Sequence, residues 1–280
     1  MRKFSIYDFR FPIGERVIEH RKSKIGNLFA GLLSFGWMLL LARPAEAATY
    51  SMAPGDSWSA KLAQLQPGDT LLLQDGTYGP LSIDCSSNAQ NGTASAPITL
   101  KAEHERQALF KSDGSAAAFD MLFCSYWEVS GLRAESADRP YADHGVFHVY
   151  RGDHLTFRRL LAAYNNRYAN NHLYAIEESK NILIEESEGY AFHRHAFSIW
   201  KSHDVTIRRS YTNQRGWNRL PGCTYGPSVE GTPRCNGNPN GGDEAFVLYQ
   251  SSQSLVENSI AENHGSGFQA HPGGLQSRHR

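Results

Sequence analysis

One pattern constrains the fold of this chain more than any other: a short apolar alternation that returns repeatedly from residue 119 onward. Each copy opens with two apolar residues separated by one residue, and four of the five full copies close with a second such pair. The full copies cover residues 119–129, 147–157, 174–184, 197–207 and 246–256, and a sixth begins at Phe268. Alternation of period two predicts short β-strands with one buried face, whereas helical repeats would show a period of 3.6.

A glycine or serine separates the two predicted strands in the later copies, at Gly152, Ser179, Ser202 and Ser251. Except across one long gap, the copies start 22 to 28 residues apart. A unit of this length cannot enclose a core by itself, so such units stack into a solenoid. The sequence therefore predicts an all-β chain folded as a parallel β-helix, with two strands in each coil.

The chain before residue 119 is less regular. Irregular first coils are expected at residues 71–73, 98–100 and 108–110. Trp58, Leu62 and Leu65 lie at helical spacing, and Ser57 can cap a helix that starts after it. We expect this short helix to cover the open N-terminal end of the solenoid.

The predicted first coils carry three motifs, Pro67-Gly68-Asp69-Thr70, Asp75-Gly76-Thr77-Tyr78 and Pro97-Ile98-Thr99-Leu100-Lys101-Ala102-Glu103. Together they resemble the opening of secreted proteins of the pectate-lyase-like superfamily, which includes chondroitinase B and alginate lyases. At the level of fold, the resemblance covers most of the chain after residue 47. It implies a right-handed, single-stranded parallel β-helix with a polysaccharide as its partner. These motifs build coils rather than a reaction centre, so they do not define an activity.

Other motifs mark the known reactions of that superfamily, and this sequence lacks them. The Asn-Thr-Asp, Asp-Asp and Gly-His-Gly segments of polygalacturonase-like hydrolases are absent, as is the Asp-Pro-His-Asp segment of alginate epimerases. Lys180 and Arg194 are the nearest counterparts to the lysine and arginine of the chondroitinase B and alginate lyase group, without the surrounding motif. The resemblance therefore implies polysaccharide contact rather than a particular reaction.

Residues 1–47 have the features of an export signal. Basic residues precede an apolar run at 28–41, and the small-residue motif Ala45-Glu46-Ala47 follows. A membrane anchor is the alternative, but the run is short for a span and no later run is longer. We expect a domain over residues 48–280 that is secreted, periplasmic or on the cell surface, with no membrane contact after the signal is removed.

The charge balance bears on the partner. The whole chain has 28 basic and 28 acidic residues, and removal of residues 1–47 leaves 20 basic against 24 acidic ones. Because a nucleic-acid-binding protein needs a net positive field to neutralise phosphates, this balance argues against such a partner.

All four cysteines follow the predicted signal, so an oxidising compartment favours disulfides. Cys223 and Cys235 bracket a Gly/Pro-rich stretch and suit a bridge that closes a loop. A Cys85–Cys124 pair then remains by subtraction. Zinc is the alternative, although no C-x-x-C pattern is present among the cysteines.

Two segments depart from the repeat. Residues 211–243 form an insertion that we expect to emerge beside the start of a strand. The sixth copy breaks off after Pro272-Gly273-Gly274. A solenoid needs a cover over its last coil, so we expect either a C-terminally shortened chain or a partner that covers this end.

Stacked coils bring equivalent residues within about 4.8 Å of each other, so the alignment predicts columns of neighbours. The first column alternates in charge and predicts a structural ladder of ion pairs on an outer face. Its members are Arg158-Arg159, Glu185-Glu186, Arg208-Arg209 and Glu257.

The second column is mostly aromatic and lies on the outward side of the first strand. It runs through Tyr150, Glu177, Trp200, Tyr249 and His271. Two interpretations stay open. The rings could stack on the sugars of a polymer, or they could pack beneath a surface loop.

The third column begins the same strand and is polar. It comprises Asn171-His172, Arg194-His195 and Asp243-Glu244, beside the predicted insertion. Polar groups that converge next to a loop can form a cleft. We expect His172, Asp243 and Glu244 to contact substrate there.

A β-elimination on a uronic-acid polymer needs a cation to neutralise the carboxylate, a base and an acid. Arg194 could neutralise the carboxylate, His195 or Lys201 could act as the base, and Tyr249 could donate the proton. Alternatively, His172 and His195 are turn residues that serve structure alone. A metal held by His172, His195 and Glu244 is a further alternative, and a requirement for Ca²⁺ stays open.

Two functional hypotheses follow. The first is a polysaccharide lyase that acts by β-elimination through the Arg194–His195 cleft. The second is a non-catalytic β-helix that binds glycans or serves a structural role at the cell surface, with Tyr150 and Trp200 as stacking residues.

Overall fold

The computed structural model describes residues 46–87, 89–137, 145–165, 171–192, 194–214 and 244–262, together with the backbone of strands at 266–271 and 278–279. The predicted export signal, apart from its last two residues, lies outside this part of the chain, as do Asp243, Cys223 and Cys235. No helix in the described part has the length and apolar character that crossing a membrane requires.

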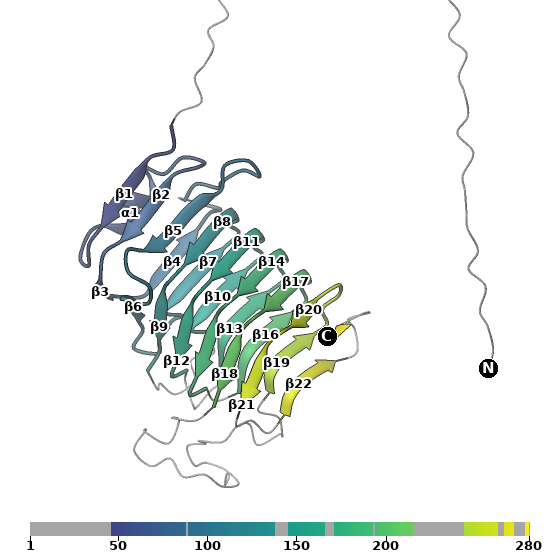
Figure 1. The fold of residues 1–280 in the computed structure, drawn as a ribbon. Helices are drawn as coiled ribbons and strands as arrows, with labels where there is room; N and C mark the ends of the chain where they lie inside the picture. The colour runs from purple at the N-terminus through teal and green to yellow at the C-terminus, as the bar shows by residue number, and fades with distance from the viewer. Residues whose placement is uncertain are drawn as a thin grey trace, which may run out of the picture. The chain divides into compact units, whose positions relative to one another are not determined.

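Within the described residues, the strands form three sheets, and the chain passes through them in the same order in each coil (Figure 1). Sheet A contains β1 (Thr49–Met52), β2 (Thr70–Leu73), β5 (Ile98–Ala102), β8 (Ser125–Ser130), β11 (Asp153–Arg158), β14 (Lys180–Glu185), β17 (His203–Arg208), β20 (Leu255–Glu257) and β23 (Arg278–His279). Sheet B contains β3 (Gly76–Tyr78), β6 (Ala108–Lys111), β9 (Arg133–Glu135), β12 (Leu161–Ala163), β15 (Glu188–Tyr190), β18 (Tyr211–Asn213) and β21 (Ile260–Glu262). Sheet C contains β4 (Leu81–Asp84), β7 (Phe119–Leu122), β10 (Phe147–Tyr150), β13 (His172–Glu177), β16 (His195–Trp200), β19 (Glu244–Tyr249) and β22 (Ser266–His271).

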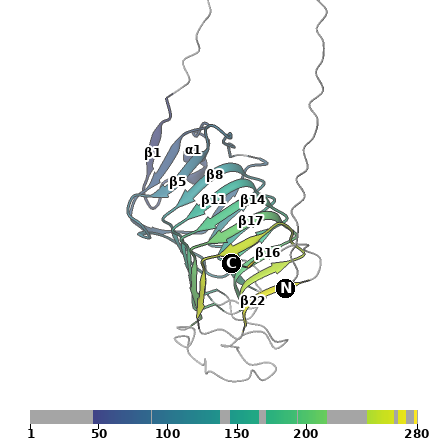
Figure 2. The ribbon, with the colours of Figure 1, turned by 45° about the vertical axis from the view of Figure 1, so that its right-hand side comes forward.

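Strands of successive coils pair in parallel within each sheet, as Figure 2 shows from a second side. The chain is therefore a parallel β-helix, as the repeats predict. The sixth copy also takes its predicted place, because Phe268 in β22 pairs with Phe246 in β19.

The prediction of two strands in each coil was wrong, because sheet B supplies a third. Its strands from β9 to β18 are three residues long, and their central positions hold small residues such as Ala134, Ala162 and Gly189. A strand with a single small inward residue shows no alternation of apolar and polar residues, so the sequence pattern does not reveal it. Tyr211, which we assigned to the insertion, begins strand β18 of this sheet and pairs with Glu188.

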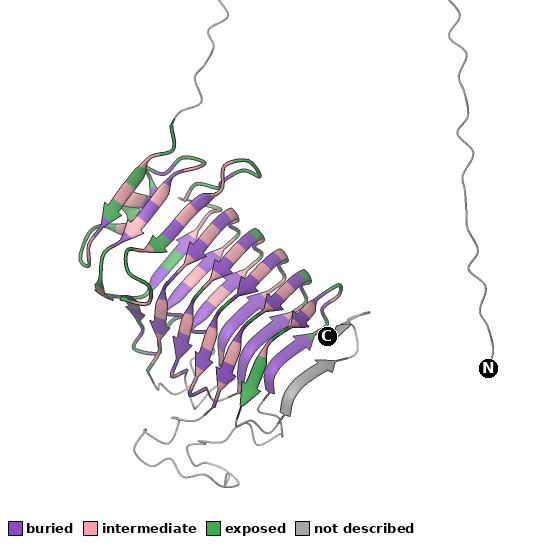
Figure 3. Cartoon of the chain, viewed as in Figure 1, coloured by how far each residue is buried: buried purple, intermediate pink, exposed green. Residues whose placement is uncertain are grey.

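The core lies inside the coils and is built from the alternating apolar positions (Figure 3). Aromatic rings form a continuous stack along sheet C through Phe119, Phe147, Tyr174, Phe197 and Phe246. Neighbouring ring centroids in this stack lie 4.4 to 5.6 Å apart. Because every member is at most 3% exposed, the stack fixes which face of sheet C points inward.

Serine hydroxyls hold the corner between sheets C and A. The backbone N–H of Gly152 donates to Ser179 Oγ at 2.9 Å, and that of Ser179 donates to Ser202 Oγ at 3.0 Å. The N–H of Ser202 donates in turn to Ser251 Oγ at 3.2 Å. We call this column the serine ladder. Its hydroxyl oxygens accept hydrogen bonds from corner N–H groups that do not take part in the pairing of strands within a sheet.

The residue before each ladder serine adopts the left-handed conformation, with φ of 46° at Glu178, 48° at Lys201 and 51° at Gln250. Such a conformation costs a residue with a side chain about 1–2 kcal/mol. Because this cost recurs at each of these corners, the stacking of neighbouring coils must hold the conformation in place. The left-handed conformation also turns the side chains of these residues outward, beside the last residue of each sheet C strand.

The predicted helix is present as α1 (Trp58–Leu62), and Ser57 caps it by accepting a hydrogen bond from the N–H of Ala60. Leu62 is buried, and the Trp58 ring lies 5.8 Å from that of Phe110. The helix thus packs on the apolar interior of the first coils.

Candidate functional site

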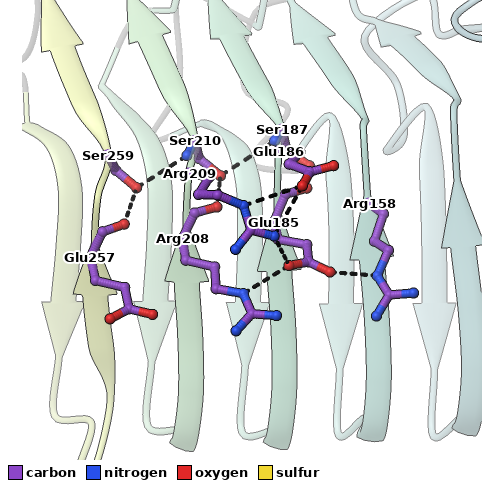
Figure 4. A network of polar contacts seen from close by, with 9 residues as sticks. All are labelled: Arg158, Glu185, Glu186, Ser187, Arg208, Arg209, Ser210, Glu257 and Ser259. Atoms are coloured by element: carbon purple, nitrogen blue, oxygen red, sulfur yellow. Dashed lines mark hydrogen bonds and ion pairs between the residues drawn. The ribbon is translucent and has the colours of Figure 1, made fainter.

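The charged column lies on the outer side of sheet A, as predicted, and Figure 4 shows its contacts. The carboxylate of Glu185 accepts from Arg158 Nε at 2.5 Å and from Arg208 Nε at 2.7 Å. Arg209 reaches both Glu185 and Glu186. Burial raises the pKa of Glu185, but the two flanking arginines outweigh burial and hold the pKa below its ordinary value. This column ties coils together and makes sheet A a structural face.

The outer side of sheet C has a different character. The predicted aromatic column is confirmed by the strand register, in which Tyr150 pairs with Glu177, Glu177 with Trp200, and Trp200 with Tyr249. These positions alternate with the buried stack, so their side chains point outward. Tyr249 is 40% exposed, and the other three are partly exposed.

The left-handed corner residues add charge beside this column. Arg151 contacts Glu178 through two nitrogens at 2.9 Å, and its guanidinium carbon lies 4.9 Å from the centre of the Tyr150 ring. Lys201 Nζ lies 4.1 Å from the centre of the Trp200 ring. Each of these two rings therefore has a cation held next to it.

We call this surface the aromatic face. It consists of Tyr150, Arg151, Glu177, Glu178, Trp200, Lys201 and Tyr249. It offers flat rings, two cations and two carboxylates over adjacent coils.

Sequence reasoning missed a histidine at the edge of the aromatic face. His148 lies two residues before Tyr150 on the same side of β10, and its Nδ1 is 2.8 Å from Asp120 Oδ1. Ser82 donates to the other oxygen of Asp120 at 3.0 Å, while His148 Nε2 lies 3.9 Å from Glu177 Oε2. The alignment of His148 with Asp120 in neighbouring copies was the available signal.

The surroundings of His148 favour its charged form. Burial lowers its pKa, but the contacts to Asp120 and Glu177 outweigh burial and raise the pKa to about 9. His148 is therefore a cation at neutral pH, held between two carboxylates.

The predicted polar column also forms, with His172 paired to His195 and His195 to Glu244. The two imidazole rings stack at 4.9 Å, and His195 Nδ1 lies 2.8 Å from Glu244 Oε2. The side chains of His195 and Glu244 are 8% and 6% exposed. Burial raises the pKa of Glu244, but His195 outweighs burial and keeps the pKa below its ordinary value.

The four residues that we expected to act together fall into two groups. His195 shares the inward side of β16 with Phe197, and Arg194 precedes it at the start of the strand. Tyr249 pairs with the last residue of that strand, and Lys201 follows that residue. Five residues at 3.3 Å each place this end of the strand about 16 Å from His195. The structure therefore brings Lys201 and Tyr249 to the aromatic face without Arg194 and His195. Asp243, the other expected contact residue, is not described.

In the part of the chain that the structure describes, no group of three or more His, Cys, Asp or Glu side chains is arranged to hold a metal ion.

The cysteine prediction is confirmed for one pair. Cys85 and Cys124 form a disulfide that joins adjacent coils, with their Cα atoms 4.9 Å apart. Cys124 is fully buried.

No protein-family model matches this chain, and no curated protein matches it. Among solved structures it is similar to pectate lyase Pel9A, with a TM-score of 0.42 and 16% identity over 83% of this chain and 74% of that one. It is also similar to an alginate lyase from Paenibacillus sp., with a TM-score of 0.34 and 13% identity over 82% and 98%. A pectin methylesterase from Aspergillus niger has a TM-score of 0.41 and 12% identity over 85% and 75%.

Proposed function

We propose that this protein binds an acidic polysaccharide along the aromatic face of sheet C. The observation that carries the proposal is the repetition of an aromatic–cation pair, Tyr150 with Arg151 and Trp200 with Lys201. Tyr249 extends the column by one coil beyond Trp200. Rings take up the apolar C–H side of a sugar, and cations take up its carboxylate.

The cations remain available to a ligand. A cation–π contact at an exposed site is worth about 0.5–1 kcal/mol, so Lys201 can exchange the Trp200 ring for a carboxylate at little cost. Arg151 is held by Glu178, and its side chain is 53% exposed. The extended stack of coils suits a long polymer better than a compact ligand.

The binding test measures the affinity of the protein for pectate, alginate, hyaluronan and a neutral glucan by calorimetry. We expect one or more acidic polymers to bind, and Trp200→Ala to weaken that binding about tenfold, or about 1.4 kcal/mol. Tyr126→Ala is the matched control, since Tyr126 is a partly exposed ring on sheet A, stacked on His154. Equal affinity in the wild type and Trp200→Ala would overturn the proposal.

A lyase reaction on the same polymer is a second candidate function. It is favoured by the position of Lys201 next to Tyr249, where the backbone N–H of Lys201 donates to the backbone carbonyl of Tyr249 at 2.9 Å across adjacent coils. In a β-elimination, Lys201 in its neutral amine form would take the proton alpha to the carboxylate. The bond to the leaving oxygen would break as the double bond forms, and Tyr249 would protonate that oxygen. The ultraviolet absorbance of unsaturated uronate tests this reaction. A rise that disappears in Tyr249→Phe supports it, and no rise with any bound polymer rejects it.

We also propose that the chain is exported after removal of residues 1–47. The disulfide between Cys85 and Cys124 supports an oxidising compartment. N-terminal sequencing of the protein from its source tests this, and a mature chain that begins at Met1 would contradict it.

A further inference from the structure

We propose that Glu177 makes the aromatic face selective for a polysaccharide in which acidic and neutral sugars alternate. This inference rests on the binding function proposed above and adds a specificity-determining residue to it.

Three neighbouring coils of the face alternate in character. The coil that ends in Glu177 and Glu178 lies between two coils that each end in an aromatic residue and a cation. The strand register places Glu177 between Tyr150 and Trp200 on the outward side of sheet C. A sugar chain that follows the column therefore meets a ring with a cation, then two carboxylates, and then a ring with a cation again.

The two carboxylates of the middle coil are not equivalent. Glu178 accepts from Arg151 Nε at 2.9 Å and from the Tyr150 hydroxyl at 3.4 Å, so its charge is balanced within the protein. Among the described residues, Glu177 has an ion-pair contact with His148, at the longer distance of 3.9 Å, and one third of the Glu177 side chain is exposed.

A carboxylate can only accept hydrogen bonds, so Glu177 would bind sugar hydroxyl or amide N–H groups. A second carboxylate placed over it would meet a like charge, and such juxtapositions reduce affinity for the wrong partner. The sugar above Glu177 is therefore a neutral one, while the sugars beside Arg151 and Lys201 are acidic.

The spacing agrees with this assignment. The two aromatic–cation pairs are separated by two coil steps, or about 9.6 Å at 4.8 Å per step. That separation is close to the length of a disaccharide unit in an extended polysaccharide. A repeat of one acidic and one neutral sugar thus matches the separation of the two aromatic–cation pairs.

The test compares two polymers of similar length, polygalacturonate, in which every sugar is acidic, and hyaluronan, in which glucuronate alternates with a neutral amino sugar. We expect the wild type to bind hyaluronan at least tenfold more tightly than polygalacturonate. Glu177→Gln removes the charge but keeps the shape, and we expect it to reduce that ratio about tenfold, mainly by improving binding of polygalacturonate. Glu128→Gln, on a partly exposed carboxylate of sheet A, is the matched control and should leave the ratio unchanged.

The outcomes separate the two proposals. Binding of both polymers with equal affinity, or an unchanged ratio in Glu177→Gln, would overturn the role of Glu177 and leave the binding function standing. Absence of binding to every acidic polymer would overturn both. Circular dichroism of each variant shows whether the β-structure is retained.

Discussion

Cys124 occupies the corner position that later coils give to Ser179, so the disulfide to Cys85 takes the place of a rung of the serine ladder. In the later coils the link between neighbouring corners is a hydrogen bond, and between the coils of Cys85 and Cys124 it is covalent. Gly152 lies between the two kinds of link, where an added Cβ would come within 2.7 Å of Val149 and Leu155 side-chain carbons. The corner column therefore changes in chemistry along the stack of coils.

Replacing both cysteines with serine, in Cys85→Ser/Cys124→Ser, should lower the free energy of unfolding. The disulfide joins residues 39 apart, and the loop-entropy model assigns such a closure about 4 kcal/mol. We expect a loss of about 2–4 kcal/mol in denaturant unfolding followed by circular dichroism. A loss below about 1 kcal/mol would show that stacking alone holds the early coils.

Ser202→Ala should destabilise the later coils. Ser202 is 2% exposed, and its hydroxyl accepts from the N–H of Ser179 and donates to the carbonyl of Trp200. Its removal leaves a buried donor without its partner, so we expect a cost of about 1–3 kcal/mol. Ser95→Ala, on an exposed turn, is the control and should change stability by less than about 0.5 kcal/mol. Equal stabilities of the two variants would contradict the ladder.

Glu185 should make stability depend on acid. Its pKa is lower in the folded protein than in the unfolded chain, so its stabilisation is present above about pH 4.3 and is lost as pH falls through the folded pKa. Glu185→Gln should remove this part of the pH dependence and cost about 1–3 kcal/mol at pH 7. Glu186→Gln, at an exposed position, should cost less than about 1 kcal/mol. Parallel stability curves for wild type and Glu185→Gln between pH 3 and 7 would be evidence against this account.

His148 should give the opposite dependence. Its folded pKa of about 9 exceeds the ordinary value of about 6.5, so its contribution is complete below about pH 6.5 and is lost as pH rises through about 9. Asp120→Asn should return the His148 pKa toward its ordinary value. Titration of the imidazole signals by NMR measures both values, and a wild-type pKa below 7 would refute the ion-pair cluster.

The regular part of the fold was predictable because two of the three strands in a coil carry a strong alternation. Sheet B was not, since small inward residues such as Ala162 and Gly189 leave no periodic signal. The columns were predictable as well, because a constant ten-residue offset fixes the register of stacked coils. Their environment was harder to infer, since burial at the ends of strands depends on the connecting segments.

The grouping of candidate residues shows the same limit. Counting by twos from Phe197 places His195 on the inward side and Trp200 on the outward side of β16. Residues in one column are close because they lie in adjacent coils, whereas residues at opposite ends of one strand, such as His195 and Trp200, stay far apart. His148 was overlooked because its importance comes from Asp120 and Glu177, which lie in the preceding and following coils.

The most direct test of the binding face is a crystal structure of the protein with an acidic hexasaccharide that binds in solution. The account predicts sugar rings over Tyr150, Trp200 and Tyr249, with carboxylates at Arg151 and Lys201. Sugar bound at sheet A or sheet B, with the aromatic face empty, would contradict it.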